Sequence, residues 1–336
     1  MPIRSTVKSE SYYDFFSNSG KDTDAFDYDP PLVIDPWFGD RAVIHGGSIA
    51  PSNPGLSNII QYVTITSAGN AVDFGDLPKT LSSMAGVSNA SRGVSAGGKG
   101  PGGNDGSNSI QYVTIANTGN TTDFGDLTVG GSSQGDAQYI TGVSNSTRGL
   151  IAGLTPSNDG IDYITIASTG NASSFGNLSV ARRMGGSGGN GTKAVFGGGG
   201  SSNPGSDVID YVTMATTGNA ADYGDLTQNR RYCSGTSNKD RTLFMGGSVA
   251  EAGDGVNTID YIEINSSGNA TDFGDLTLRR YGPGCFANST RALAAGGSYP
   301  SANVIDYVTI ANTGNSTDFG DLLNATAWPT GCCSGD

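Results

Sequence analysis

The chain has 336 residues, of which 53 are glycine, and it carries a formal net charge of −13 with a pI near 4.3. Proteins that bind nucleic acid usually show a basic patch or a high pI, so we expect no nucleic-acid partner. No apolar stretch follows Met1. We therefore expect neither a signal peptide nor membrane insertion, and synthesis in a cytoplasm without export.

The first segment, residues 1–39, resembles no other part of the sequence and holds eight of the 28 aromatic residues. Disordered tails are poor in aromatics, whereas extended segments that are rich in them usually bury their rings on a surface. We predict an anchoring arm, which either folds back on its own chain or docks on a neighbouring subunit. The predicted contacts are Tyr12, Tyr13, Phe15 and Phe16 for the partner, with Trp37 and Phe38 packing on the rest of the chain.

Residues 40–336 repeat one pattern six times. The aligned tyrosines are Tyr62, Tyr112, Tyr163, Tyr211, Tyr261 and Tyr307. Each repeat predicts four short strands: a small-residue run before Ser-Asn-x-x-Arg, an apolar run that ends in a glycine pair, the IDYVTI segment, and the DFGDL segment. Thr-Gly-Asn or Ser-Gly-Asn between the last two strands supplies the glycine that a hairpin turn needs. The repeated Tyr and Phe are expected to pack in the core.

The repeats also predict how the fold closes. Leu276 precedes the next repeat's Arg291 by 15 residues, and Leu322 precedes the C-terminal Asp336 by 14. The run TGCCSGD is therefore expected to be the first strand of the blade whose other strands start at Arg41. Such closure removes exposed strand edges and predicts an all-β, six-bladed β-propeller over residues 40–336.

Each repeat has a glycine pair, then a tyrosine strand, then an aromatic about a dozen residues later, as at Phe74, and this order resembles the kelch repeat. The late aromatic is Phe or Tyr here, whereas kelch blades usually carry Trp at that place. The repeat spacing of 46 to 51 residues also fits kelch blades. The wording YVTIATTGN…DFGDL is similar to repeats of virion-associated proteins of aquatic tailed phages, cyanophages especially. This second resemblance implies a virion protein.

Strand alternation places the near-constant turns on one face and the variable loops on the other, where binding usually occurs. Three arginine pairs are expected on the variable side, as a cationic rim for an acidic partner or glycan: Arg182, Arg183, Arg230, Arg231, Arg279 and Arg280. The alternative is local pairing with the aspartate of each GDL segment.

The sequence offers no recognisable catalytic site. Its single histidine, His45, cannot supply the two histidines of a kelch-type copper site, and we expect it in the core. No GxSxG, HExxH or phosphate-binding glycine loop is present. The four cysteines are too few and too unevenly placed for a disulfide framework, and we expect buried thiols. We predict a protein that is not an enzyme and has neither cofactor nor metal.

The favoured function is a structural protein of a phage particle, such as a decoration, neck or tail-associated subunit in several copies, which binds other virion proteins through its arm. The expected location is then the virion. The alternative is an adhesin of a phage tail or fibre that binds a receptor or a host surface glycan. Exposed aromatics in the variable loops would favour the adhesin, but those loops are poor in them, with Tyr299 the clearest case.

Overall fold

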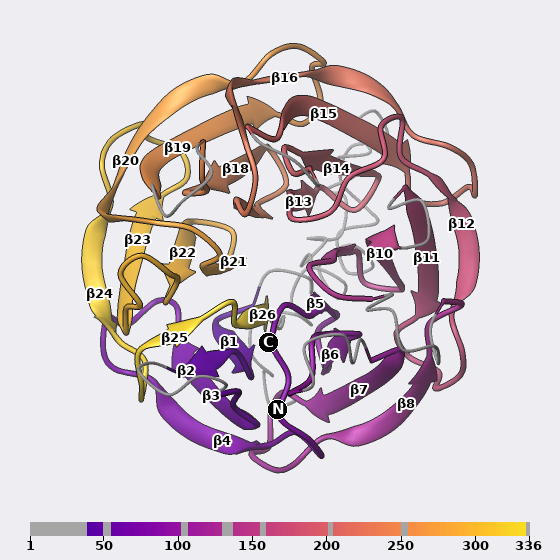
Figure 1. The fold of residues 1–336 in the computed structure, drawn as a ribbon, viewed down its shortest axis with the longest axis vertical. Helices are drawn as coiled ribbons and strands as arrows, with labels where there is room; N and C mark the ends of the chain where they lie inside the picture. The colour runs from indigo at the N-terminus through magenta and orange to yellow at the C-terminus, as the bar shows by residue number, and fades with distance from the viewer. Residues whose placement is uncertain are drawn as a thin grey trace, which may run out of the picture. The chain divides into compact units, whose positions relative to one another are not determined.

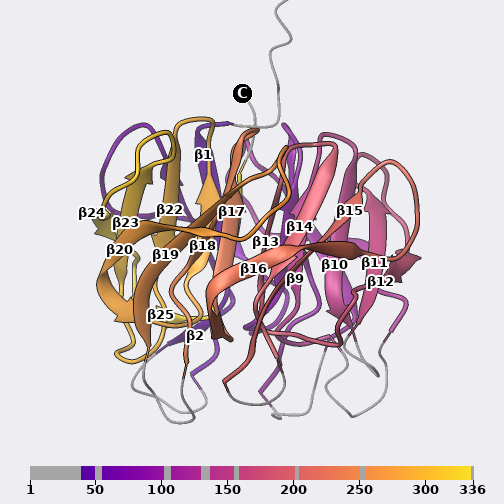
Figure 2. The ribbon, with the colours of Figure 1, turned by 90° about the horizontal axis from the view of Figure 1, so that it is seen from above.

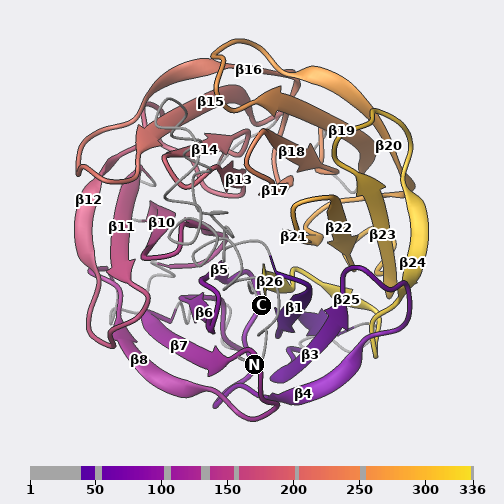
Figure 3. The same ribbon diagram turned by 180° about the vertical axis from the view of Figure 1, so that it is seen from behind.

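The computed structural model describes residues 39–49, 55–101, 107–129, 137–154, 159–200, 204–249 and 255–333. They belong to the second of the chain's two compact units, Pro36–Asp336. Six four-stranded antiparallel sheets follow one another around a ring, which makes this unit a six-bladed β-propeller (Figures 1 and 3). The predicted fold class is confirmed. Residues 1–38 of the predicted arm, including Trp37 and Phe38, lie outside the described residues.

Each blade is given from its innermost to its outermost strand. Blade 1 holds β26 (Thr330–Cys333), β1 (Arg41–His45), β3 (Ile59–Thr64) and β4 (Val72–Asp76). Blade 2 holds β5 (Ala85–Ser88), β6 (Arg92–Ala96), β7 (Ser109–Thr114) and β8 (Thr122–Asp126). Blade 3 holds β9 (Thr141–Ser144), β10 (Arg148–Leu154), β11 (Gly160–Thr165) and β12 (Ser173–Asn177).

The remaining blades follow the same order. Blade 4 holds β13 (Gly186–Gly189), β14 (Lys193–Gly197), β15 (Ser206–Thr213) and β16 (Ala221–Arg230). Blade 5 holds β17 (Ser234–Ser237), β18 (Arg241–Met245), β19 (Val256–Glu263) and β20 (Thr271–Arg280). Blade 6 holds β21 (Gly284–Ala287), β22 (Arg291–Ala295), β23 (Val304–Thr309) and β24 (Thr317–Asp321). A small sheet pairs β2 (Ser48–Ile49) with β25 (Thr326–Ala327).

Blade 1 is shared between the two ends of the repeat region, as predicted. The C-terminal strand β26 pairs antiparallel with β1, from Ala42 opposite Cys333 to His45 opposite Thr330. Figure 1 shows this as a yellow strand beside an indigo one. The last strand therefore occupies the inner edge of β1 and completes the ring.

Side-chain size decreases toward the ring axis. On the outermost strands the repeated aromatics are buried, and each makes an edge-to-face contact with the tyrosine of the neighbouring strand, as Phe74 does with Tyr62 at 6.0 Å between ring centroids. The innermost strands approach one another closely: a Cβ added to Gly86 of β5 would collide with the carbonyl oxygen of Gly331 in β26. Small residues are therefore required near the axis, and the prediction that the repeated aromatics form core is confirmed.

The repeated basic residue links each blade to the next. In blade 1 the Arg41 guanidinium lies 4.7 Å from the Tyr62 ring centroid, and its Nη1 donates to the carbonyl of Ile115 in blade 2 at 3.0 Å. Equivalent contacts recur around the ring, and Arg291 of blade 6 closes the circle by donating to Ile65 of blade 1 at 3.0 Å. The arginine thus orients the tyrosine and ties neighbouring blades together.

The ring has two different faces, which Figure 2 shows edge-on. The turn face carries the turns between strands one and two and between strands three and four of each blade. Asp40, just before β1, lies on this face, where its Oδ1 accepts a hydrogen bond from Asn288 Nδ2 at 3.0 Å. The loop face carries the loops between strands two and three and the connections between blades. The chain therefore enters the propeller on the turn face.

Candidate functional site

Three of the six arginines predicted on a binding rim are buried in ion pairs. Arg182, Arg230 and Arg280 are 3%, 0% and 0% exposed, and they contact Asp210, Asp260 and Asp306 at 2.8, 2.7 and 2.8 Å. Both parts of the prediction need correction at these positions. The three arginines are not at the surface, and their partners are the aspartates of strand three of the next blade, not those of the GDL segments.

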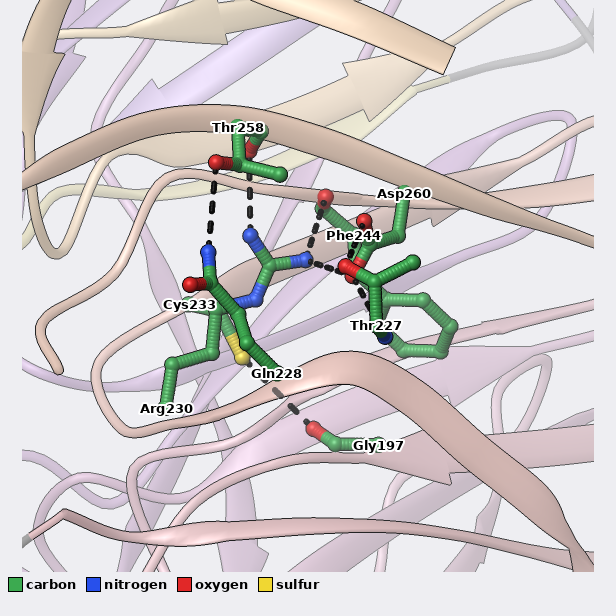
Figure 4. Close-up of polar contacts among 8 residues, drawn as sticks. All are labelled: Gly197, Thr227, Gln228, Arg230, Cys233, Phe244, Thr258 and Asp260. Atoms are coloured by element: carbon green, nitrogen blue, oxygen red, sulfur yellow. Dashed lines mark hydrogen bonds and ion pairs between the residues drawn. The ribbon is translucent and has the colours of Figure 1, made fainter. Parts of the chain in front are cut away.

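Figure 4 shows one of these buried sites. Arg230 Nη2 donates to the carbonyl of Phe244 at 3.2 Å and to Asp260 Oδ2 at 2.7 Å, and its Nη1 donates to the carbonyl of Thr258 at 3.1 Å. The Asp260 Oδ1 accepts from Thr227 Oγ1 at 2.7 Å. Arg230 ends blade 4 and its partners in blade 5 surround its guanidinium, so the residue fastens one blade to the next.

Strand geometry explains why only one arginine of each pair turns inward. Successive side chains of an extended segment point to opposite sides, so two adjacent arginines cannot both enter the core. Of the other three, Arg183 and Arg231 are half-buried and Arg279 is exposed. Only these three remain available to a partner on the loop face.

The residue at the position of the buried arginine matches, in charge, the strand-three residue that it faces in the next blade. Where strand three carries Gln111 or Gln61, the preceding connection holds Leu81 or Thr326 in place of arginine. Asp162 is the exception: it is 2% exposed, and Ala137 stands where an arginine would be. Burial raises the pKa of Asp162, although hydrogen bonds from Thr128 oppose that shift. One aspartate is therefore buried without a cationic partner among the described residues.

A second arrangement, at the loop-face mouth of the central channel, was not foreseen from the sequence. One residue from each blade lies two positions before the innermost strand, and all six have positive φ between 50° and 69°. These mouth-ring residues are Ser83, Tyr139, Met184, Tyr232, Gly282 and Trp328. The amide of each donates to the carbonyl of its counterpart in the preceding blade at 2.6 to 3.1 Å. Six backbone hydrogen bonds thus form a closed circle around the mouth.

Two further tyrosines pack against this ring and form an aromatic cluster. The cluster consists of Tyr139, Tyr232, Tyr281, Tyr299 and Trp328. Tyr281 stacks on Tyr232 with centroids 5.2 Å apart and on Tyr299 at 5.3 Å. Trp328 lies edge-on to Tyr139 at 6.0 Å and covers Gly282, where a Cβ would collide with its indole. Five rings that are distant in the sequence therefore share one surface.

Three cations surround the cluster. Lys99 and Arg183 lie 5.9 and 5.7 Å from the Tyr139 ring centroid, and Arg231 lies 5.1 Å from that of Tyr232. Burial raises the pKa of Tyr232, and the neighbouring Tyr139 adds to the shift, whereas Arg231, Arg183 and Lys99 oppose it. Cation–ring contacts at these distances are favourable. Among the described residues, the mouth is thus an aromatic site with three cations around it, on a protein that is acidic as a whole.

The sequence contained a signal for the mouth ring that we did not use. Tyr139, Met184, Tyr232 and Trp328 occupy the same repeat position, but that position lies in the connections between blades, where the sequence is least regular. The equivalence becomes visible when the connections are aligned on the innermost strand that follows each of them, since these residues all lie two positions before it. In the sequence, the variable loops are poor in aromatics, with Tyr299 the clearest case. The other four rings of the cluster lie in the connections between blades.

His45 lies in the core, as predicted. It is 0% exposed, and neither ring nitrogen makes a hydrogen bond within the described residues. Burial lowers the pKa of His45 from 6.5 to about 4. Within the same part of the chain, no group of three or more His, Cys, Asp or Glu is placed to hold a metal ion, and no helix is long and apolar enough to cross a membrane.

The low pKa of His45 predicts an acid-sensitive fold. Because the folded state disfavours the protonated ring, its contribution to stability is complete above pH 6.5 and falls progressively toward pH 4. From pH 7 to pH 4.5 this loss is on the order of 2 kcal/mol. The variant His45→Met, which copies Met245 at the same position of blade 5, should lack it. Urea unfolding at both pH values tests this, and an equal loss in both proteins would contradict it.

No protein family model and no curated protein matches this sequence. The resemblance to kelch repeats and to phage proteins therefore rests on the repeated sequence alone. The propeller itself is a fold compatible with binding and protein interaction.

Proposed function

We propose that the protein is a non-enzymatic binding subunit of a phage particle, held there by residues 1–39 and presenting its loop face to a ligand. The observation that carries the proposal is the aromatic cluster with its three cations at the channel mouth. Aromatic side chains and arginine are enriched where proteins bind partners. Neither the solubility of the protein nor the closure of the ring requires aromatic residues or arginines at the channel mouth.

The direction in which the chain enters the ring supports the same proposal. Asp40 lies on the turn face, opposite the mouth that bears the aromatic cluster. A segment attached on the turn face can hold the subunit in an assembly while the loop face remains accessible. Anchoring and binding are then separate functions of opposite faces.

Two phage roles fit this arrangement, and the cluster distinguishes them. A decoration or neck subunit needs an anchor, but it does not need an exposed aromatic site on the far face. An adhesin needs both, and Tyr299 remains 59% exposed within the cluster. The structure of the mouth therefore favours the receptor-binding role over a purely structural one.

Deleting residues 1–38 should leave a folded, monomeric propeller that no longer joins its assembly. The ring closes through β26 and β1 without these residues. Burying one large apolar ring contributes about 1.5–3 kcal/mol, so several together could hold a subunit in place. Thermal melting and gel filtration report the fold, and co-purification with particles reports incorporation.

A variant with Tyr12, Tyr13, Phe15 and Phe16 changed to serine is the matched control for length. We expect it to fold and to be lost from particles as the deletion is. Full incorporation of either protein would rule out anchoring, and unfolding of the deletion would indicate that the segment folds back on its own propeller.

A further inference from the structure

The side chains of the mouth ring are not explained by the ring itself. Its circle of hydrogen bonds uses only backbone amides and carbonyls, so the circle itself requires no particular side chain and excludes only proline, which has no amide N–H. Glycine adopts positive φ without strain, as Gly282 does here, whereas tyrosine and tryptophan do not. Tyr139, Tyr232 and Trp328 are nevertheless held in this conformation. Strained residues of this kind gather at ligand sites, because the strain places a side chain where function requires it.

The rings also form a surface that a flat apolar group can contact. Tyr139, Tyr232 and Trp328 line an open depression of about 70 Å³, a shallow surface site that is smaller than the usual enclosed pocket for a small molecule. Tyr299 stacks on Tyr281 at its rim and leaves most of its own surface in solvent. A sugar ring presents several C–H groups on one face, and these pack well on an aromatic face, whose charge is negative.

The charges around the cluster restrict the class of ligand further. The formal net charge of the chain is −13, yet within the part of the chain that the structure describes, the charged groups that act on Tyr232 are Arg231, Arg183 and Lys99, all of them positive. Arg183 and Arg231 are only half-buried, so their guanidinium groups can still pair with an anion. Guanidinium groups bind carboxylates and other oxyanions in forked geometry.

We propose that the channel mouth binds an anionic saccharide, which stacks one sugar face on the aromatic cluster and places its carboxylate or sulfate among Lys99, Arg183 and Arg231. The inference rests on the proposed binding role of the loop face. An acidic peptide fits less well, because peptides usually add to a free strand edge or fill a groove, whereas this site is a single depression inside a closed ring.

The test measures binding by the full chain with calorimetry at low salt. The probes are an oligosaccharide of uronic acids, a sulfated one, a neutral one of equal length, and a polyglutamate peptide. We expect the carboxylated or the sulfated probe to bind at least tenfold more tightly than the neutral probe. Comparison of the first two probes shows whether the site prefers a carboxylate or a sulfate. Binding should weaken with added salt.

Two variants and one control locate the site. The double variant Arg183→Ser, Arg231→Ser should lose at least tenfold in affinity and most of the salt dependence, and Tyr299→Ala should also lose affinity. Arg279→Ser is the matched control, because Arg279 is the exposed arginine of the corresponding pair in blade 5, and the cation–ring contacts among the described residues of the cluster come from Arg183, Arg231 and Lys99 instead. Melting temperatures must agree with the parent protein.

Equal affinity for the neutral and anionic saccharides, unchanged affinity in the double variant, or tighter binding of polyglutamate would each overturn the inference. So would the absence of binding to every saccharide. The broader proposal fails separately. If loop-face variants still prevented particles from attaching to cells while no saccharide bound, only the ligand class would be wrong. If those variants attached normally, the binding role itself would be lost.

Discussion

Replacing Asp260 with asparagine should lower the free energy of unfolding by about 3–5 kcal/mol. The substitution keeps the size of the side chain and an oxygen that can accept from Thr227, but it removes the charge that balances Arg230. Both residues are 0% exposed, so water cannot compensate the guanidinium. Urea unfolding at neutral pH measures the effect.

The other blades supply matched controls. Asp162→Asn removes an equally placed carboxylate that has no arginine, and we expect no loss of stability at pH 7, or a gain. Burial raises the pKa of Asp162, so its contribution is complete below the usual value of 3.8 and is lost as pH rises through the raised pKa. Asparagine does not ionise and escapes that loss.

A double variant tests whether charge matching is the cause. Arg230→Leu with Asp260→Gln reproduces the uncharged combination of Leu81 and Gln111. Buried ion pairs can often be replaced by well-packed uncharged groups at little cost, so most of the loss should be recovered. Similar losses in Asp260→Asn and Asp162→Asn, or no recovery in the double variant, would show that the ion pair does not explain the burial of Arg230.

Removing residues 330–336, and with them β26, should be at least as damaging. Blade 1 would lose its innermost strand, and β1 would expose an unpaired edge along Ala42 to His45. The deleted strand also packs against the neighbouring blades, since Gly331 lies against Phe286 and Gly86. We expect a loss on the order of 5 kcal/mol or more, comparable to the net stability of many domains, with aggregation. The melting temperature should fall by at least about 10 °C.

Adding the missing strand back separates closure from a general effect of truncation. A synthetic peptide of residues 330–336 can pair with the open edge of β1, as donated strands do in other sheets. It should restore the melting temperature and suppress aggregation, whereas a peptide of the same composition in scrambled order should not. If the truncated chain melts like the parent protein, the shared blade contributes little to stability.

The sequence by itself determined the blades and their number. Each strand has a local cause: β-branched and aromatic residues in β3, the turn Ala68-Gly69-Asn70 after it, and small residues in β5. Six copies of the aligned tyrosine and a C-terminal run of the right length also predicted that β26 completes blade 1. These features recur in every repeat, so the strands predicted for one blade apply to all six.

Only the tertiary structure decided which polar and aromatic residues meet. Arg230 and Arg231 look alike in sequence, and the direction of one extended segment sends the first into blade 5 and leaves the second at the mouth. Tyr139, Tyr232 and Trp328 come from blades that the chain visits far apart. Closure of the ring places their equivalent positions around one axis. The short distances between these side chains arise only from that closure, so no local sequence pattern predicts them.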